Sequence, residues 1–508
     1  MSSRAPKLVA TALVVSCLIT VPFMGASADS GANSAPVATN LLTGETLALA
    51  SSVGAWKAQA GTLALAGRGN LAATTTIQGG TLALSGLTTT GSAGQVYRGA
   101  FSVRAARTSR PVTPLLLFYD NAGAVLDRVK GEVGADSSSA WRPITPVVAI
   151  APPRTAFVAL GFLTTGDAVN EVHYLTQPSV TSATPARTDV VGPLRTVGNK
   201  VVDANGPLVL RGIHRVALEG FMGNSTGRNL TAEDLSQAKR WGANTVRLSL
   251  SSSFWLSSNC HYDPRYAAAV DQAVRGVTSQ RMVALLDLHT NTPTACGKVE
   301  PQVMADRSAL TFWRDVASRY ASNPLVAFDL YNEPHDISDK VWLDGGVVAT
   351  RTGPFNAVGM QDLYDAVRGT GATNLVVVSG NNWANTLPAN RVSGTGIVYG
   401  VHAYTCPTAV DSSCAPNPYD PASILSSWVA PAKDVPVAVT EFGWPSTASG
   451  RYIENVIAFA HAQSWGWIAF AWDGTTSGTF SLLSTAGPGA SYQPTPAGMP
   501  VLDSLAAS

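Results

Sequence analysis

Charged residues are scarce in this chain of 508 residues. Asp, Glu, Lys and Arg together make up 13% of the sequence, and the formal net charge is +1. Because the charged residues are few and balanced in sign, the chain has neither a basic surface that would bind nucleic acid nor a tail of like charges. We therefore expect no nucleic-acid partner, and a neutral ligand such as a sugar fits this composition.

Cysteine is also scarce, with five residues, and no Cys-x-x-Cys or histidine-rich spacing that would indicate a metal site. Cys17 falls in an apolar N-terminal segment, which leaves an even number. An even number in an exported protein is typical of disulfides, and four cysteines allow three pairings. Cys406–Cys414 closes a short loop and is the natural local pair, which leaves Cys260–Cys296.

Long apolar runs are absent except at the beginning of the chain. Arg4 and Lys7 precede an apolar run from Leu8 to about Met24, and small residues follow at Ala26 to Ala28. This order is typical of a signal peptide over residues 1–28. We therefore expect a secreted, extracellular protein that has no membrane contact once the signal is removed.

Two alternatives for this segment stay open. A membrane anchor would need about 20 apolar residues, and this run is shorter and is interrupted by Pro22. Val14 to Cys17 also resembles a lipoprotein processing box, so lipidation of Cys17 is the second alternative.

The length suggests two or three domains. Residues 36–185 are rich in Thr, Ala, Gly, Ser and Val, and alternate apolar and small residues as in Gly61–Leu65 and Gly80–Leu84. Period-two alternation with intervening glycine predicts short antiparallel strands, and many of them predict a β-sandwich. We place a linker at 186–196 and a second domain at 197–508.

In the second domain, strand-like apolar runs alternate with helical segments such as 231–241 and 308–320. Eight such units predict a closed (β/α)₈ TIM barrel, an α/β fold. An open doubly wound sheet is the alternative, but a glycine-rich phosphate loop is missing after the first strand. The expected strands are 208–214, 245–250, 282–289, 325–331, 375–379, 397–402, 435–440 and 467–471.

Polar residues collect where these strands end, at the barrel face that carries active sites. Glu333 and Glu441 each follow an apolar run, and a pair of carboxylates on one rim is the equipment for cleaving a glycosidic bond. The candidate residues of the rim are Arg247, His289, Asn332, Glu333, His402, Tyr404, Glu441 and Trp472.

From about Pro193 to Ala506 the chain resembles glycoside hydrolase family 5, the cellulase family of the retaining-barrel clan. The resemblance rests on six elements in the order of that family, which are Arg247, His289, Asn332-Glu333-Pro334, His402-Ala403-Tyr404, Glu441-Phe442-Gly443 and Trp472. One departure occurs after the first strand, where His214-Arg215 replaces the asparagine frequent in the family. That difference bears on the choice of substrate.

The resemblance implies a role for each residue. Glu333 would be the general acid and base and Glu441 the nucleophile, which Arg247 would keep ionised. Asn332 would bind the sugar 2-hydroxyl, and Tyr404 would touch the nucleophile. The remaining expected sugar-binding residues are His289, His402 and Trp472, the last by stacking its ring on the sugar.

The first domain resembles jelly-roll carbohydrate-binding modules through its Phe118 to Gly123 run and Trp141. Trp56, Tyr97 and Trp141 are candidate stacking residues, and a spacer without sugar affinity is the alternative. A structural calcium ion there would leave no readable signature in the sequence.

Together these features predict a secreted, monomeric, retaining β-glycosidase that acts on a polysaccharide or oligosaccharide. An endo-β-1,4-glucanase is the default from the family, while a β-mannanase, an exo-acting enzyme and a non-catalytic wall protein are the alternatives. No metal or organic cofactor is expected, because two carboxylates and water suffice. A Ser/His/Asp hydrolase, the rival enzyme class, would need a Gly-x-Ser-x-Gly elbow between a strand and a helix.

Overall fold

The computed structural model describes most of the chain. The described residues are 40–42, 56–67, 70–85, 91–93, 95–131, 133–183, 188–220, 230–291, 302–350, 353–404, 420–474, 480–484 and 492–506. Among these residues, no helix is both long enough and apolar enough to span a membrane. The expected signal peptide lies outside the described residues.

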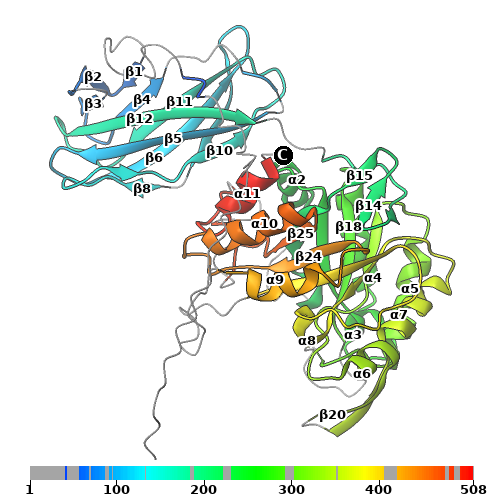
Figure 1. Ribbon diagram of the computed structural model, residues 1–508. Coiled ribbons are helices and arrows are strands. Elements are labelled where there is room, and N and C mark those ends of the chain that lie inside the picture. The colour runs from blue at the N-terminus through cyan, green and yellow to red at the C-terminus, as the bar shows by residue number, and fades with distance from the viewer. Residues whose placement is uncertain are drawn as a thin grey trace, which may run out of the picture. The chain divides into compact units, whose positions relative to one another are not determined.

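The N-terminal part is formed by two antiparallel sheets (Figure 1). The order in the first is β1 (Trp56–Gln59), β4 (Leu82–Ser85), β11 (Phe157–Thr164), β6 (Pro111–Tyr119) and β7 (Val125–Lys130), with β8 (Gly134–Ala135) paired to β6. The order in the second is β10 (Val147–Ile150), β5 (Val96–Ala105), β12 (Val172–Ala183), β3 (Asn70–Thr75) and β2 (Gly61–Leu65), with β9 (Arg142–Pro143) on β5.

The two sheets share one hydrophobic core, as expected for a sandwich. Two of its aromatic residues, Trp56 and Tyr97, were candidate sugar-stacking residues, but both are buried in the core. Trp141 is half-buried and lies beside Tyr174, with ring centroids 6.5 Å apart. The all-β prediction is confirmed, whereas sugar binding by this part stays a prediction.

The second part is a closed barrel of eight parallel strands, and this prediction is confirmed. Each observed strand lies within a few residues of the expected one, which means that the apolar runs identified the barrel correctly. The strands are β16 (Arg211–Arg215), β17 (Thr245–Ser251), β18 (Val283–Thr290), β19 (Val326–Asp329), β22 (Val376–Ser379), β23 (Ile397–Ala403), β24 (Val437–Phe442) and β25 (Gly466–Phe470).

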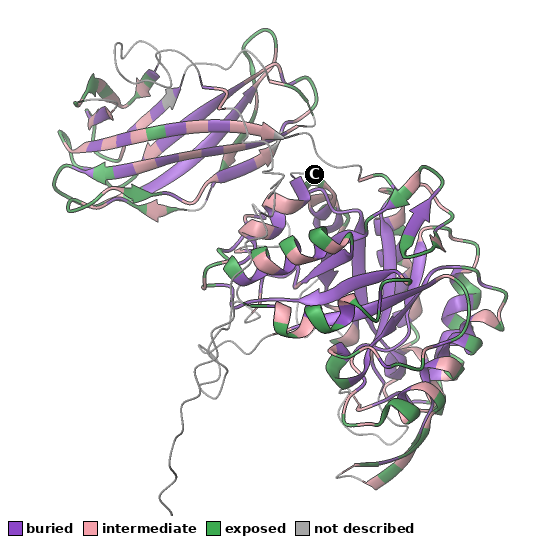
Figure 2. Ribbon diagram, viewed as in Figure 1, coloured by how far each residue is buried: buried purple, intermediate pink, exposed green. Residues whose placement is uncertain are grey.

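Alternation along the strands separates the barrel interior from the helix-facing side. In β18, Ala284, Leu286 and Leu288 pack in the larger outer cluster, while Val283 and Leu285 belong to a separate inner cluster. Beyond them, the same inward parity places Asp287 and His289 toward the other end of the barrel. Figure 2 shows the strands as buried. The polar site is therefore built on strands that are rigidly packed.

A small antiparallel sheet contributes to the inner apolar cluster at the end where the barrel strands begin. It consists of β13 (Arg195–Val197), β14 (Lys200–Asp203) and β15 (Gly206–Leu208), with Val201 and Leu208 in that cluster. The candidate site residues lie at the opposite rim, where the strands end.

Helices alternate with the strands and lie outside the barrel (Figure 1). Helix α2 begins as the sequence predicts, since the Thr231 hydroxyl accepts a hydrogen bond from the Asp234 amide. The longer helices are α2 (Ala232–Arg240), α4 (Tyr266–Thr278), α5 (Arg307–Tyr320), α7 (Met360–Arg368), α9 (Ala422–Val429), α10 (Arg451–Gln463) and α11 (Met499–Ala506). Shorter elements are η2 (Leu218–Gly220), α3 (Ser252–Trp255), α6 (Asp339–Asp344), α8 (Asn381–Ala384) and the hairpin of β20 (Gly346–Thr350) and β21 (Gly353–Ala357).

Candidate active site

Arg247 lies at the centre of the polar cluster, and its side chain has no exposed surface. It donates hydrogen bonds to Glu441 Oε2 at 2.8 Å, Asn332 Oδ1 at 2.9 Å and Asp329 Oδ2 at 2.9 Å. Burial lowers the pKa of a guanidinium, but the carboxylates of Asp287, Asp329 and Glu441 raise the pKa of Arg247 above its ordinary value. Arg247 is therefore a fixed positive charge that orients three strand-end residues.

Glu441, on β24, is held by several donors. Its Oε1 accepts a hydrogen bond from the Tyr404 hydroxyl at 2.9 Å, and its Oε2 lies 3.3 Å from His214 Nδ1. Burial raises the pKa of a carboxyl group, but His402, His214 and Arg247 together hold the pKa of Glu441 well below its ordinary range. Glu441 is therefore an ionised carboxylate at neutral pH.

Glu333 occupies a different environment just beyond β19. Its side chain is 27% exposed, compared with 8% for Glu441, and its Oε1 lies 2.7 Å from His402 Nδ1. A carboxylate oxygen of Glu333 lies within 4.8 Å of one of Glu441. The structure thus brings the two carboxyl groups together and surrounds them differently.

His289 completes the cluster on the β18 side. Its Nδ1 lies 2.7 Å from Asp287 Oδ2. Burial lowers the pKa of an imidazole, but Asp287 outweighs this effect and the pKa of His289 is raised to about 9. His289 is therefore an imidazolium at neutral pH, with Nε2–H as its remaining donor.

Three site residues were not identified as such from the sequence. Asp287 and Asp329 are fully buried beside Arg247, and His214 lies 3.0 Å from Arg247 Nη1 through its Nδ1. Burial and Arg247 lower the pKa of His214 to about 4, so its ring is neutral. The period of two could have identified Asp287, since it shares the inward parity of His289 two residues later.

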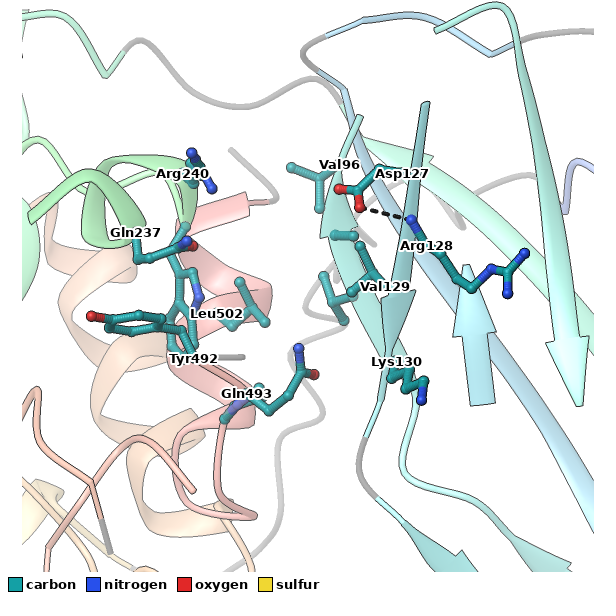
Figure 3. Close-up of a pocket in the computed structure, with 14 residues that line it drawn as sticks. Val96, Asp127, Arg128, Val129, Lys130, Gln237, Arg240, Tyr492, Gln493 and Leu502 are labelled. Atoms are coloured by element: carbon teal, nitrogen blue, oxygen red, sulfur yellow. Dashed lines mark hydrogen bonds between the residues drawn. The ribbon is translucent and has the colours of Figure 1, made fainter. Parts of the chain in front are cut away.

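Trp472 is not brought into the cluster. Its ring has no exposed surface, its Nε1 donates to Asp234 Oδ1 at 3.0 Å, and it packs against Trp241 and Tyr492. Figure 3 shows Tyr492 on the same side of a pocket as Gln237 and Arg240 of α2. In this conformation Trp472 has no ring face to offer a sugar, contrary to the sequence-based expectation.

Phe470 takes the place expected for Trp472. It ends β25, is half-buried, and its ring centroid lies 5.1 Å from that of His214 and 6.4 Å from that of Phe480. Phe480 in turn lies 5.8 Å from Tyr404, which binds Glu441. Phe470 is therefore separated from Glu441 only by His214 and from Tyr404 only by Phe480 in these chains of contacts.

The other rim tryptophans differ in exposure. Trp444 is buried and stacks on Tyr452, and Trp255 packs edge-on against Phe312. Trp383 is 41% exposed and stacks on the ring of His335. Trp383 is thus the best placed of the three to meet a ligand.

Several expectations fall on parts of the rim that are not described. Cys260 lies in an exposed turn, while Cys296, Cys406 and Cys414 lie outside the described residues, so the pairing stays a prediction. The letters Gly-x-Ser-x-Gly occur at 223–227, also outside the described residues and eight positions beyond the end of β16 rather than directly after a strand.

Two groups within the cluster have metal-ligand spacing, namely His214–Asp287–His289 and Glu333–His402–Glu441. Hydrogen bonds and ion pairs with Arg247, Tyr404 and each other already account for the positions of these groups. The arrangement can instead act through two carboxyl groups, one ionised and buried and one facing the open rim.

Comparison with known proteins agrees with this geometry. The family model described as cellulase, glycosyl hydrolase family 5, matches residues 202–476, which is more than half of the chain. Endoglucanase 3 of Humicola insolens is 29% identical over 157 residues, 29% of this chain and 36% of that protein. Endoglucanase E-5 of Thermobifida fusca is 26% identical over 268 residues, 52% of this chain and 51% of that protein. The chain thus spans about half or less of the length of these relatives.

Solved structures resemble the chain at lower identity. The catalytic domain of the Thermobifida fusca endoglucanase aligns with a TM-score of 0.46 and 19% identity, over 62% of this chain and 97% of that domain. A variant of the same domain, solved in complex with cellotetraose, aligns with a TM-score of 0.46 and 18% identity, over 62% of this chain and 97% of that one.

Proposed function

The chain belongs to glycosyl hydrolase family 5, the cellulase family, and from that premise we propose that it is a retaining endo-β-1,4-glucanase. In this proposal Glu441 is the nucleophile and Glu333 is the general acid and base. A retaining glycosidase needs two carboxyl groups about 5 Å apart, whereas an inverting one needs about 6.5–9.5 Å to admit a water molecule. The separation within 4.8 Å between oxygens of Glu333 and Glu441 is the observation that carries the proposal.

The environments of the two carboxyl groups support these two roles. Glu441 is held ionised by Arg247 and oriented by Tyr404, as a nucleophile must be. Among the described residues, the carboxyl group of Glu333 has a hydrogen-bond contact only with His402. It is also the more exposed of the two carboxyl groups. It is therefore the group that can exchange a proton with the leaving oxygen and then with water.

Two displacements follow from these positions. Glu441 attacks the anomeric carbon, the glycosidic C–O bond breaks, and Glu333 gives its proton to the departing oxygen. Glu333 then takes a proton from water, whose oxygen attacks the same carbon and displaces Glu441. The sugar keeps its anomeric configuration, and both carboxyl groups return to their starting states.

The neighbouring residues would bind the sugar. The carbonyl oxygen of Asn332 is taken by Arg247, which leaves its amide nitrogen to donate to a hydroxyl near the cleaved bond. His289, charged and half-buried, can donate through Nε2. The ring of Phe470 is the candidate for apolar contact with the sugar ring in place of Trp472.

Glutamine variants of the two carboxyl groups test the mechanism. Glu333→Gln should lower kcat about 10²–10⁴-fold on a glucan, since general acid catalysis contributes about that factor. It should lose much less on an aryl glucoside whose leaving group needs no proton. Glu441→Gln should be inactive on both substrates. Wild-type hydrolysis by either variant would remove the assignment, whereas a wild type that hydrolyses no glycoside would favour a non-catalytic sugar-binding protein.

The substrate and mode of attack need a separate measurement. A profile of products from β-1,4-glucan, β-1,3-glucan and mannan separates the candidates, because loops choose the sugar in this fold. We expect soluble cellulose derivatives to yield a mixture of oligomers and a rapid fall in viscosity. Release of single sugars alone would indicate an exo-acting enzyme, and preference for mannan would indicate a β-mannanase.

We further propose export of the chain and sugar binding by the sandwich. The apolar segment after Lys7 supports export, and the half-buried pair of Trp141 and Tyr174 supports a binding surface. Retention of the full chain on insoluble cellulose, compared between wild type and Trp141→Ala, tests the second point. Equal retention of both proteins would leave the sandwich as a spacer.

A further inference from the structure

A second polar cluster lies in the sandwich, far along the sequence from the catalytic residues. His173 in β12 and Asp167 in the preceding loop are both buried, and Glu171 lies between them, immediately before β12. One donor atom from each of these three residues lies within 4.8 Å of the others. His173 Nε2 is 3.7 Å from Asp167 Oδ2 and 3.9 Å from Glu171 Oε2.

These distances are close to those of a metal site. Bonds of about 2.0–2.2 Å to nitrogen and oxygen put the donors of a tetrahedral zinc site about 3.3–3.6 Å apart. The two separations from His173 Nε2 exceed the upper end of that range by about 0.1 and 0.3 Å. Small side-chain rotations of Asp167 and Glu171 would close the difference.

The surroundings of His173 match those of a metal-binding histidine. Its Nδ1 lies 2.5 Å from Asp136 Oδ2, and Asp136 is itself held through Oδ1 by the amide of Arg110. A metal-ligating histidine usually donates its other ring N–H to a carboxylate, which fixes the tautomer with a lone pair on the ligating nitrogen. The contact with Asp136 thus leaves the lone pair on His173 Nε2, which lies near Asp167 and Glu171 and can bind a cation.

Two buried atoms of the cluster have no hydrogen-bond partner among the described residues. They are His173 Nε2 and Asp167 Oδ1. The other oxygen of Asp167 accepts hydrogen bonds from the hydroxyls of Thr75 and Thr164. Unpaired buried polar atoms are costly and rare, and a bound ion would satisfy both at once.

The charge of the cluster also calls for a cation. Asp136, Asp167 and Glu171 contribute three negative charges, and Arg110 contributes one positive charge through its paired contacts with Glu171 at 2.6 and 2.7 Å. The three carboxyl groups of this largely buried cluster are thus matched by a single arginine. A divalent ion would balance the two that remain.

We propose that the sandwich binds one divalent transition-metal ion, zinc in the first place, through His173, Asp167 and Glu171. An imidazole nitrogen with two carboxylates favours zinc over calcium, which takes six to eight oxygen ligands. Asp167 lies in the loop between β11 and β12, which belong to different sheets. The ion would therefore fasten the two sheets together at one end of the sandwich.

The test uses the full chain after removal of metals with a chelator. Zinc chloride should bind to the wild type with one equivalent more than to His173→Gln or Asp167→Asn, and it should raise the melting temperature of the wild type only. Asp136→Asn, which alters only the histidine's partner, should weaken zinc binding about 10- to 100-fold. Asp167→Asn is nearly isosteric and serves if His173→Gln does not fold.

Asp120→Asn is the matched control in the same part of the chain. Asp120 caps the turn between β6 and β7 through the amides of Ala122 and Ala124, so its loss should leave zinc affinity unchanged. Equal zinc stoichiometry in the wild type and both ligand variants would overturn the proposal, as would a wild type that zinc does not stabilise. Stabilisation by calcium chloride alone would overturn the assignment to a transition metal.

Discussion

Arg247 donates a hydrogen bond to Glu441 at 2.8 Å, although 194 residues separate them in the sequence and Arg247 has no contact with solvent. The same guanidinium also holds Asn332 and Asp329. Because a guanidinium presents its donors in a rigid planar fork, one side chain can set the positions of residues on or just after two other strands, β19 and β24. The catalytic geometry therefore depends on the shape of arginine as well as on its charge.

Arg247→Lys should separate shape from charge. Lysine keeps the positive charge but cannot reach Glu441, Asn332 and Asp329 together, so we expect kcat to fall by at least about tenfold. Burying a charge with poorer pairing should also lower the free energy of unfolding, and the loss of a whole buried pair would cost about 3–5 kcal/mol. Steady-state kinetics and chemical denaturation measure the two effects. Arg314→Lys, on the exposed face of α5, is the control and should change neither.

Tyr404→Phe should move the acidic limb of the pH–activity profile to higher pH. The Tyr404 hydroxyl stabilises the ionised form of Glu441, and a hydrogen bond to a charged group contributes about 1.5–3 kcal/mol. Its loss should raise the pKa of Glu441, so that the nucleophile becomes protonated at a higher pH. An unchanged acidic limb would show that Tyr404 does not act through Glu441. Tyr399→Phe, on the strand that precedes Tyr404 but with its hydroxyl bonded to the carbonyl of Val392, is the control.

His289 should make the stability depend on pH in the alkaline range. Its pKa is about 9 in the folded protein and 6.5 in the absence of the fold, so the folded state binds the extra proton between these values. The contribution of His289 to the free energy of unfolding is complete below pH 6.5 and is lost as the pH rises through about 9. Between these values the free energy of unfolding should fall by up to about 1.4 kcal/mol per pH unit. Denaturation of wild type and His289→Gln from pH 6 to 10 should show this slope in the wild type only.

A second histidine variant is the control for the comparison of wild type with His289→Gln. His261→Gln removes a histidine from the turn between α3 and α4 and should keep the wild-type slope. If the slope of His289→Gln equalled that of the wild type, the contact with Asp287 would not raise the pKa of His289.

Substitutions of Phe470 and Trp472 should have opposite effects on kinetics and stability. Phe470→Ala should raise KM or lower kcat with little change in stability, because its ring packs against His214, which contacts Glu441. Trp472→Phe should lower the free energy of unfolding by about 1–3 kcal/mol, because Asp234 loses a buried donor, and should leave KM unchanged. Kinetics and denaturation of both variants decide between them. A large change in KM for Trp472→Phe would restore the role expected from the sequence.

The barrel and most of its rim could be predicted from the sequence because the signals are local. An apolar run followed by a polar residue identifies a strand and its end, and the closed barrel then puts all strand ends on one rim. Glu333, Glu441, Arg247 and Asn332 were found in this way, and the structure brings them together.

The sequence by itself thus determined which strands form and which polar residues end them, since both follow from patterns within a few residues. Only the tertiary structure decided which of these side chains meet. Arg247 finds Asp329 and Glu441 across 82 and 194 residues, and Trp472 turns to Asp234 on α2 while Phe470 lies beside His214. Such pairings depend on packing between distant segments, which no local pattern records.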